Sequence, residues 1–269
     1  MYGTQWPWVE LFQTLHEYDG ADAYSDVLEQ WPAQHADECR WLADFSRRTQ
    51  CCWDAATDED LCRLYAVFRV TSTLLLRFQV GRADGTDYTG PAISLEGYQF
   101  FHEALGFSVP ENMGFHPFFH EIVGVQPTTL AESPIEIIEQ VWPPLMLGGM
   151  MFCRAACIVS GGSSHVDKKI AESSKLYWTF RRKDRPCEDQ SRGWGSNSQW
   201  RTRLRRDYQS ASGFHYNVDG EESLDIAIGN VDGIEIPAMI ELVRNRCMIR
   251  MAIDDCDLYP YRYLHTEAI

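Results

Sequence analysis

The spacing of apolar residues changes near Pro110, and this change constrains the fold more than any other feature of the sequence. Before Pro110, apolar residues recur at helical spacing, which is typical of helices that bury one face. Beyond Pro110 the apolar runs are short or alternating, as expected of strands. The sequence therefore predicts an α+β protein, in which a helical part over residues 1–110 packs on a mixed part over residues 111–269 with a small antiparallel sheet. The two parts could also form one continuous domain.

Local signals place several elements within these parts. A helix is predicted over residues 24–31, where Pro32 ends it, and a longer helix over residues 58–80. Between residues 134 and 159 the signals conflict, because the Ser-Pro-Ile-Glu sequence at Ser133 matches a capping box at a helix start while the same run also suits a strand. Both alternatives stay open. Strands are predicted over residues 119–125, 176–180, 224–228 and 248–253.

Acidic residues outnumber basic ones, with 39 Asp and Glu against 24 Lys and Arg and a formal net charge of −15. A field of this sign repels nucleic acid and anionic membranes, so the sequence predicts neither as a partner. The charge is uneven, because residues 1–62 hold 13 acids and 3 bases whereas residues 168–206 hold 4 acids and 12 bases. We refer to residues 168–206 as the basic island.

Cysteine usage and hydropathy indicate the cellular setting. The nine cysteines are an odd number and the first residues resemble no signal peptide, so we expect a cytoplasmic protein. The most apolar stretch, residues 145–159, contains Arg154 and is shorter than the roughly 20 residues that a membrane span needs. No Cys-x-x-Cys pair is present, and the sequence predicts no cofactor.

Two imidazoles and a carboxylate lie close together at His116, His120 and Glu121, which makes these residues the catalytic candidates. On a helix the two histidines would share a face and could bind a metal, so they are also weak candidates for metal ligands. Pro117 and the apolar residues that follow favour an extended chain, in which the histidines would lie about 13 Å apart. A structural pair at the start of a strand is therefore the alternative.

The basic island supplies the candidate ligand-binding or partner-binding residues, because guanidinium, indole and amide groups suit anions and protein hot spots. These candidates are Arg181, Arg182, Trp194, Asn197, Gln199, Trp200, Arg201 and Arg203. The island contains neither a phosphate-binding loop nor a dinucleotide fingerprint. Three interpretations stay open: internal neutralisation of the acidic remainder, a pocket for a small anion, and a surface for a partner.

Two functions agree with these observations. In the first, the chain is a cytoplasmic, acidic, Trp-rich protein-binding module that captures a basic protein, as a bacterial immunity protein neutralises a toxin. In the second, it is an enzyme acting on a phosphorylated or nucleotide-like small molecule, with the arginines binding the anion and His116, His120 or Glu121 serving as base or metal ligand. The sequence leaves open whether the chain is an enzyme.

Overall fold

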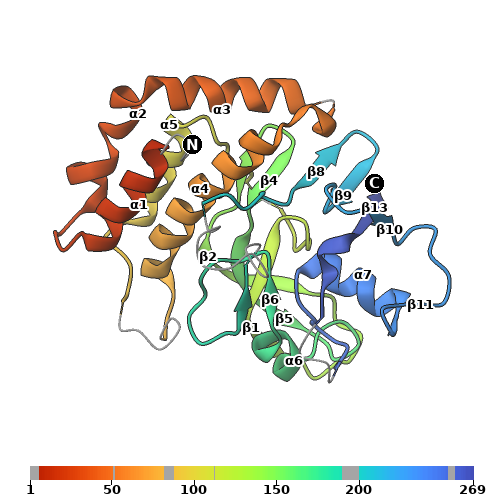
Figure 1. Ribbon diagram of the computed structural model, residues 1–269. Helices are drawn as coiled ribbons and strands as arrows, with labels where there is room; N and C mark the ends of the chain where they lie inside the picture. The colour runs from red at the N-terminus through yellow and green to blue at the C-terminus, as the bar shows by residue number, and fades with distance from the viewer. Residues whose placement is uncertain (1–5, 51, 82–87, 112, 190–199, 254–257) are drawn as a thin grey trace. The chain divides into compact units, whose positions relative to one another are not determined.

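The chain forms two compact units in a computed structural model, which describes residues 6–50, 52–81, 88–111, 113–189, 200–253 and 258–269 (Figure 1). Unit 1 comprises Met1–Val109, Thr179–Asp184 and Asp189–Leu204, and unit 2 comprises Pro110–Trp178, Arg185–Glu188 and Arg205–Ile269. Unit 1 is mainly helical, while unit 2 contains the sheets together with two helices. This architecture confirms the predicted α+β class.

The central helix of unit 1 is α4 (Asp58–Leu75), within the range where the sequence predicts a long helix. It begins at a capping box in which the Thr57 hydroxyl accepts a hydrogen bond from the Asp60 N–H and the Asp60 carboxylate accepts one from the Thr57 N–H. Its side chains are buried from Leu64 to its end, so neighbours surround it. The other helical segments are α1 (Pro7–Glu17), the π-helical turn η1 (Tyr24–Leu28), α2 (Trp31–Gln34), α3 (Ala36–Thr49), η2 (Trp53–Ala55), η3 (Leu76–Phe78) and α5 (Leu95–Ala104).

Pro32 begins a helix, and the prediction that it ends one is wrong. The predicted helix over residues 24–31 is replaced by η1 and α2, and Pro32 lies in the first turn of α2. Proline is tolerated there because the first N–H groups of a helix have no acceptor within the helix. The apolar spacing in this stretch is therefore produced by two short helical segments.

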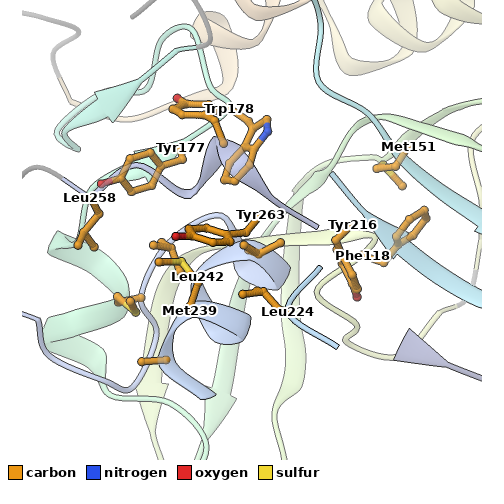
Figure 2. Packing of buried hydrophobic residues seen from close by; sticks show 14 of the residues in the cluster. Phe118, Met151, Tyr177, Trp178, Tyr216, Leu224, Met239, Leu242, Leu258 and Tyr263 are labelled. Atoms are coloured by element: carbon orange, nitrogen blue, oxygen red, sulfur yellow. The ribbon is translucent and has the colours of Figure 1, made fainter. Parts of the chain in front are cut away.

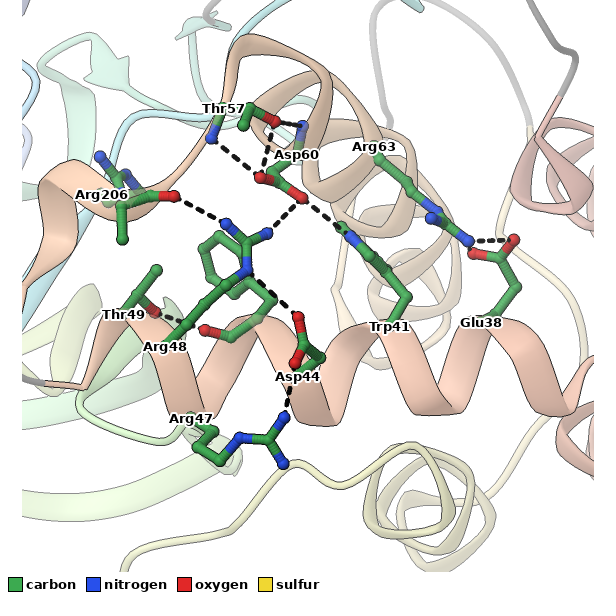
Figure 3. A network of polar contacts seen from close by, with 12 residues as sticks. Glu38, Trp41, Asp44, Arg47, Arg48, Thr49, Thr57, Asp60, Arg63 and Arg206 are labelled. Atoms are coloured by element: carbon green, nitrogen blue, oxygen red, sulfur yellow. Dashed lines mark hydrogen bonds and ion pairs between the residues drawn. The ribbon is translucent and has the colours of Figure 1, made fainter.

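Buried polar contacts join α3 to α4 within unit 1 (Figure 3). The Asp60 carboxylate accepts hydrogen bonds from Trp41 Nε1 (2.9 Å) and Arg48 NH2 (2.5 Å). Although burial raises the pKa of Asp60, the hydrogen bonds from Arg48 and Thr57 lower it to about 2. A second carboxylate, Glu38, accepts from Arg63 (2.6 Å). These buried charges are paired, as burial requires.

Unit 2 contains one three-stranded and one six-stranded sheet, with two short strand pairs. The first sheet has the order β1 (His120–Pro127), β5 (Ala155–Gly161), β2 (Glu136–Trp142). The second has the order β10 (Glu222–Ser223), β13 (Tyr263–Ala268), β9 (Gly213–Tyr216), β8 (Asp207–Ser210), β4 (Met150–Cys153), β3 (Leu145–Leu147). The short pairs are β6 (Leu176–Tyr177) with β7 (Cys187–Glu188) and β11 (Asn230–Val231) with β12 (Ile234–Glu235), and the helical segments are α6 (Lys168–Ser173), α7 (Ile236–Asn245) and η4 (Pro260–Arg262).

The stretch that the sequence left open, residues 134–159, consists mainly of strands. Residues 136–142 form β2, which pairs antiparallel with β5, whereas β1 pairs parallel with β5. The β-branched residues of β2 favour a strand, and its last residue, Trp142, becomes 1% exposed. Pairing with β5 and the burial of Trp142 therefore outweigh the helix-start signal of the capping box at Ser133.

The core of unit 2 is rich in aromatic residues (Figure 2). Tyr177, Trp178 and Tyr263 lie over Met239 and Leu242 of α7. All five side chains are at most 2% exposed. This packing attaches α7 and β13 to the rest of the unit.

Two predicted strands of unit 2 are wrong, those over residues 224–228 and 248–253. The strand β10 covers Glu222–Ser223 and ends before residue 224. Residues 248–253 contain no strand. The Glu241 carboxylate of α7 accepts the N–H groups of Ile249 (3.0 Å), Arg250 (2.9 Å) and Met251 (3.1 Å). A side chain thus takes the place of a neighbouring strand as hydrogen-bond acceptor.

Candidate functional site

The two predicted catalytic histidines flank a turn that leads into β1, whose first residue is His120. Residues 117–119 form this turn, which the His120 N–H closes by donating to the His116 carbonyl (3.0 Å), so the extended chain predicted at Pro117 is wrong. The His116 Nδ1 atom accepts from the Phe118 N–H (3.2 Å), and the His120 Nδ1 atom lies 3.0 Å from both the backbone nitrogen and the carbonyl oxygen of His116. Burial lowers the pKa of both imidazoles, so both are neutral at pH 7.

The third catalytic candidate, Glu121, lies in β1 and is 5% exposed. Its neighbour in sequence, His120, is 3% exposed, whereas His116 keeps a side-chain exposure of 29%. The three residues are therefore close in the chain, but only His116 is substantially open to solvent.

His116 belongs to a polar cluster that includes Glu267 of β13. The Glu267 Oε2 atom accepts from the Tyr216 hydroxyl (2.9 Å) and from Arg244 Nε (3.0 Å), and it lies 3.8 Å from His116 Nε2. Although burial raises the pKa of Glu267, the hydrogen bonds from Tyr216 and Arg244 lower it below its usual value. The cluster joins β9, β13 and α7, and its carboxylate is ionised and well supplied with donors.

Most bases of the basic island contact groups of their own unit. Ion pairs join Lys168 to Glu172, Lys175 to Glu188, Arg203 to Asp58 and Arg206 to Asp219. Backbone carbonyl oxygens accept hydrogen bonds from Lys183, Arg185 and Arg205. This pattern favours internal neutralisation over the two other interpretations of the island.

Some predicted binding residues can be placed and others cannot. Trp194, Asn197 and Gln199 lie outside the described residues. Arg181, Arg182, Trp200, Arg201 and Arg203 belong to unit 1, and His116, His120 and Glu121 belong to unit 2. The two sets of candidate residues therefore lie in different units.

Trp200 contributes to a buried aromatic enclosure in unit 1. The Arg69 guanidinium lies 4.2 Å from the ring centroids of Trp200 and Phe180 and 4.8 Å from that of Phe12. Arg69 is 4% exposed, and burial lowers its pKa. Such cation–π contacts stabilise a guanidinium inside a unit, so the Trp200 ring is engaged in packing.

The tryptophans in the described part of the chain form no exposed surface. Trp8, Trp31, Trp142 and Trp178 are at most 5% exposed. The other tryptophans in the described ranges are partly buried. The Trp-rich composition therefore serves the cores of the two units.

Carboxylates, in contrast, are open to solvent in the first part of unit 1. The exposed acids that form no ion pair within the described part of the chain are Glu10, Glu17, Asp19, Asp26, Glu29, Asp54 and Glu59. Exposed charges of one sign add to a potential that acts over about 10 Å at ordinary ionic strength. The acidic stretch thus exposes several carboxylates without an ion pair, whereas most bases of the basic island contact groups of their own unit.

A cavity of about 650 Å³ lies in unit 2 between α6, α7 and the segment from Met248 to Ile253. Its lining is mainly apolar, with Leu242, Met248 and Leu258, and it includes Lys169. The volume falls in the range of small-molecule sites. None of the predicted site residues lines it.

Within the described ranges, no group of three or more His, Cys, Asp or Glu side chains is arranged to hold a metal ion. The same ranges contain no helix with both the length and the apolar character needed to cross a bilayer. Comparison of the chain with models of protein families, with curated proteins and with solved structures finds no match.

Proposed function

We propose that the chain is a protein-binding module that captures a basic protein. The observation that carries this proposal is the separation of charge, because the acids of the first 62 residues are largely exposed while the island's bases mostly contact groups of their own units. The net charge of −15 is thereby concentrated at the surface. A surface of this sign accelerates the association of a basic partner and repels acidic ones.

Neutralisation of a toxin is the more specific form of this proposal. Many toxins act on nucleic acid or nucleotides and must therefore carry basic surfaces. A cytoplasmic acidic module that covers such a surface would block the toxin by competing for it. Co-expression of the chain with its captured partner tests this form, because survival of cells that the partner alone would kill is the expected result.

The first experiment is quantitative capture with a tagged full-length chain in cells of its own source, followed by kinetics on the purified pair. We expect one basic protein at equal stoichiometry, with an association rate that falls steeply as salt increases. In a variant with Glu10→Lys, Glu17→Lys and Glu29→Lys, the association rate should fall by about 10-fold or more. All three side chains are exposed, so the fold should be unchanged.

A matched control exchanges a surface ion pair on α3 without changing the net charge. The substitutions Asp37→Arg and Arg40→Asp reverse an exposed i,i+3 pair. This control should bind like the wild type. The proposal is contradicted if the retained partner is acidic, or if its association rate responds to neither salt nor charge reversal.

The alternative, an enzyme acting on a phosphorylated or nucleotide-like molecule, has less support. Arg182 is 5% exposed and Arg203 pairs with Asp58, so these two bases are engaged. The Nδ1 atoms of His116 and His120 both contact backbone groups of residues 116 and 118. A thermal melt with adenosine monophosphate or inorganic phosphate tests this alternative, because a specific anion pocket would raise the melting temperature.

A further inference from the structure

The loop between β10 and β11 presents two apolar side chains to solvent. Ile226 is 82% exposed and Ile228 is 94% exposed. Single exposed apolar residues are common, but two isoleucines in three residues form a small apolar tip. We name this tip, residues 226–228, the isoleucine tip.

The loop is held at both of its ends. Before the isoleucine tip, Leu224 is 2% exposed in the core of unit 2, and its N–H donates to the Leu264 carbonyl (2.9 Å). After it, β11 and β12 form a hairpin in which Ile234 is 8% exposed and packs in the same core. Asp232 (φ +48°) and Gly233 (φ +79°) at the hairpin turn adopt the left-handed conformations that such a turn requires.

The Asp225 side chain fixes the start of the isoleucine tip. Its Oδ1 atom lies 2.6 Å from His265 Nδ1, and its two oxygens accept the Thr266 N–H at 3.2 Å and 3.1 Å. Asp225 therefore attaches the loop to β13 directly before Ile226. The loop is anchored on a rigid sheet, and preorganisation of this kind lowers the entropy cost of binding.

Acidic residues surround the isoleucine tip. Residues 207–243 contain eight acids and neither Lys nor Arg. The exposed acids nearest in sequence are Glu221, Glu222, Asp225, Asp232 and Glu235. Arg262 lies 3.5 Å from Glu222 and 3.8 Å from Asp232, and the remaining acids leave the loop strongly negative. A surface with an apolar tip and acidic surroundings matches an apolar pocket bordered by Lys and Arg.

We propose that the isoleucine tip inserts into such an apolar, base-bordered pocket on the partner protein. This inference rests on the proposed function and adds the contact that would give affinity once the acidic surface has attracted the partner. Buried apolar anchors at the centre of an interface dominate its binding energy, while peripheral charges mainly set the association rate.

The first test places a photoreactive benzophenone amino acid at residue 226 or 228 of the full chain in its own cells. A third variant with the same group at Leu130, which is 71% exposed in the same unit, is the control. We expect one discrete adduct with a basic protein from positions 226 and 228 and none from 130. Equal crosslinking from all three positions, or an adduct with a second copy of this 31.0 kDa chain, would overturn the proposal.

The second test measures affinity for the purified partner. The double substitution Ile226→Ser and Ile228→Ser should weaken binding by about 10-fold or more, mainly through faster dissociation. The controls Leu130→Ser and Val80→Ser remove apolar side chains that are 71% and 92% exposed, and they should bind like the wild type. Unchanged binding by the double variant would overturn the role of the isoleucine tip.

The two proposals fail in different ways. If the wild type captures a basic partner but the isoleucine tip neither crosslinks to it nor affects affinity, the proposed function stands and the tip has no part in it. If the wild type captures no basic protein, the proposed function fails and this inference fails with it.

Discussion

Residues 226–228 and 248–249 both carry apolar side chains, but they lie in opposite environments in unit 2. Ile226 and Ile228 of the first segment are 82% and 94% exposed, whereas Met248 and Ile249 of the second are 5% and 8% exposed. Neither segment forms a strand. An apolar alternation therefore determines neither the backbone conformation nor the burial of a segment.

The difference arises from where the stabilising carboxylate lies. In the buried segment the carboxylate comes from outside, because Glu241 of α7 accepts three consecutive N–H groups and holds the chain against the core. In the exposed segment the carboxylate is its own, because Asp225 accepts the Thr266 N–H of β13. The residues after Asp225 gain no contact from this anchor, and the chain turns them to solvent. A carboxylate can thus hold a segment against the core, as Glu241 does, or hold only the start of a segment that is exposed to solvent, as Asp225 does.

The largest expected effect is that of Glu241→Ala, which removes the acceptor of three N–H groups. Glu241 is 8% exposed; its hydrogen bond with the Ile249 N–H is buried, and those with Arg250 and Met251 are partly buried. We expect a loss of about 3–4 kcal/mol in the free energy of unfolding, measured by urea titration, and faster amide exchange at residues 249–251. Glu241→Gln keeps one acceptor oxygen and should lose less. Unchanged exchange at residues 249–251 in Glu241→Ala would show that other contacts hold the segment.

The next largest effect is expected for Ile249→Ala, and Ile228→Ala makes the same chemical change in the exposed segment. Ile249→Ala removes buried methyl groups and should destabilise the protein by about 2–4 kcal/mol. Ile228→Ala removes the same groups from solvent and should change the free energy of unfolding by less than about 0.5 kcal/mol. Urea titrations of both variants give the comparison directly, and similar losses in both would contradict the difference in burial.

Parts of this fold are predictable from sequence because the signal is local. The apolar period after Thr57 predicts a helix from residue 58, and the start of α4 agrees with this prediction. The change of pattern near Pro110 likewise predicts the α+β class, since helical and strand periods differ. In these cases the residues that set the conformation are neighbours in the chain.

Other parts could not be predicted because the deciding group is distant in sequence. The N–H groups of residues 249–251 are accepted by Glu241, whose carboxylate reaches them only once α7 has formed. Residues 136–142 form a strand because β5 lies beside them. The contacts of the basic island likewise depend on tertiary partners such as Asp219, so composition alone could not distinguish internal ion pairs from a binding surface.

One feature of the sequence could have predicted the exposed loop. No Lys or Arg occurs between Arg206 and Arg244, although apolar residues continue through this stretch. Acidic sequence with isolated isoleucines between turn residues is unusual for a buried strand, because a strand in a core rarely has charged neighbours on both sides. This pattern predicts an exposed apolar tip better than it predicts a strand.

A smaller effect is expected for Asp225→Ala, which removes the internal anchor of the exposed segment. The side chain is partly accessible, at 32%, so water can replace the lost acceptor. We expect a loss of about 1 kcal/mol in the free energy of unfolding, together with faster exchange of the Thr266 amide. If Asp225→Ala were as damaging as Glu241→Ala, the distinction between an inward and an outward anchor would be wrong.

The smallest effect on stability is expected for the double substitution Ile226→Ser and Ile228→Ser. Both side chains are already in water, so replacing them should change the free energy of unfolding by less than about 0.5 kcal/mol, and thermal melts should coincide with the wild type. The same change should raise the solubility limit, because it removes an apolar tip that no part of unit 2 covers in the described structure. A marked loss of stability would mean that the isoleucines pack on the chain in solution, and the segment would then resemble residues 248–253 after all.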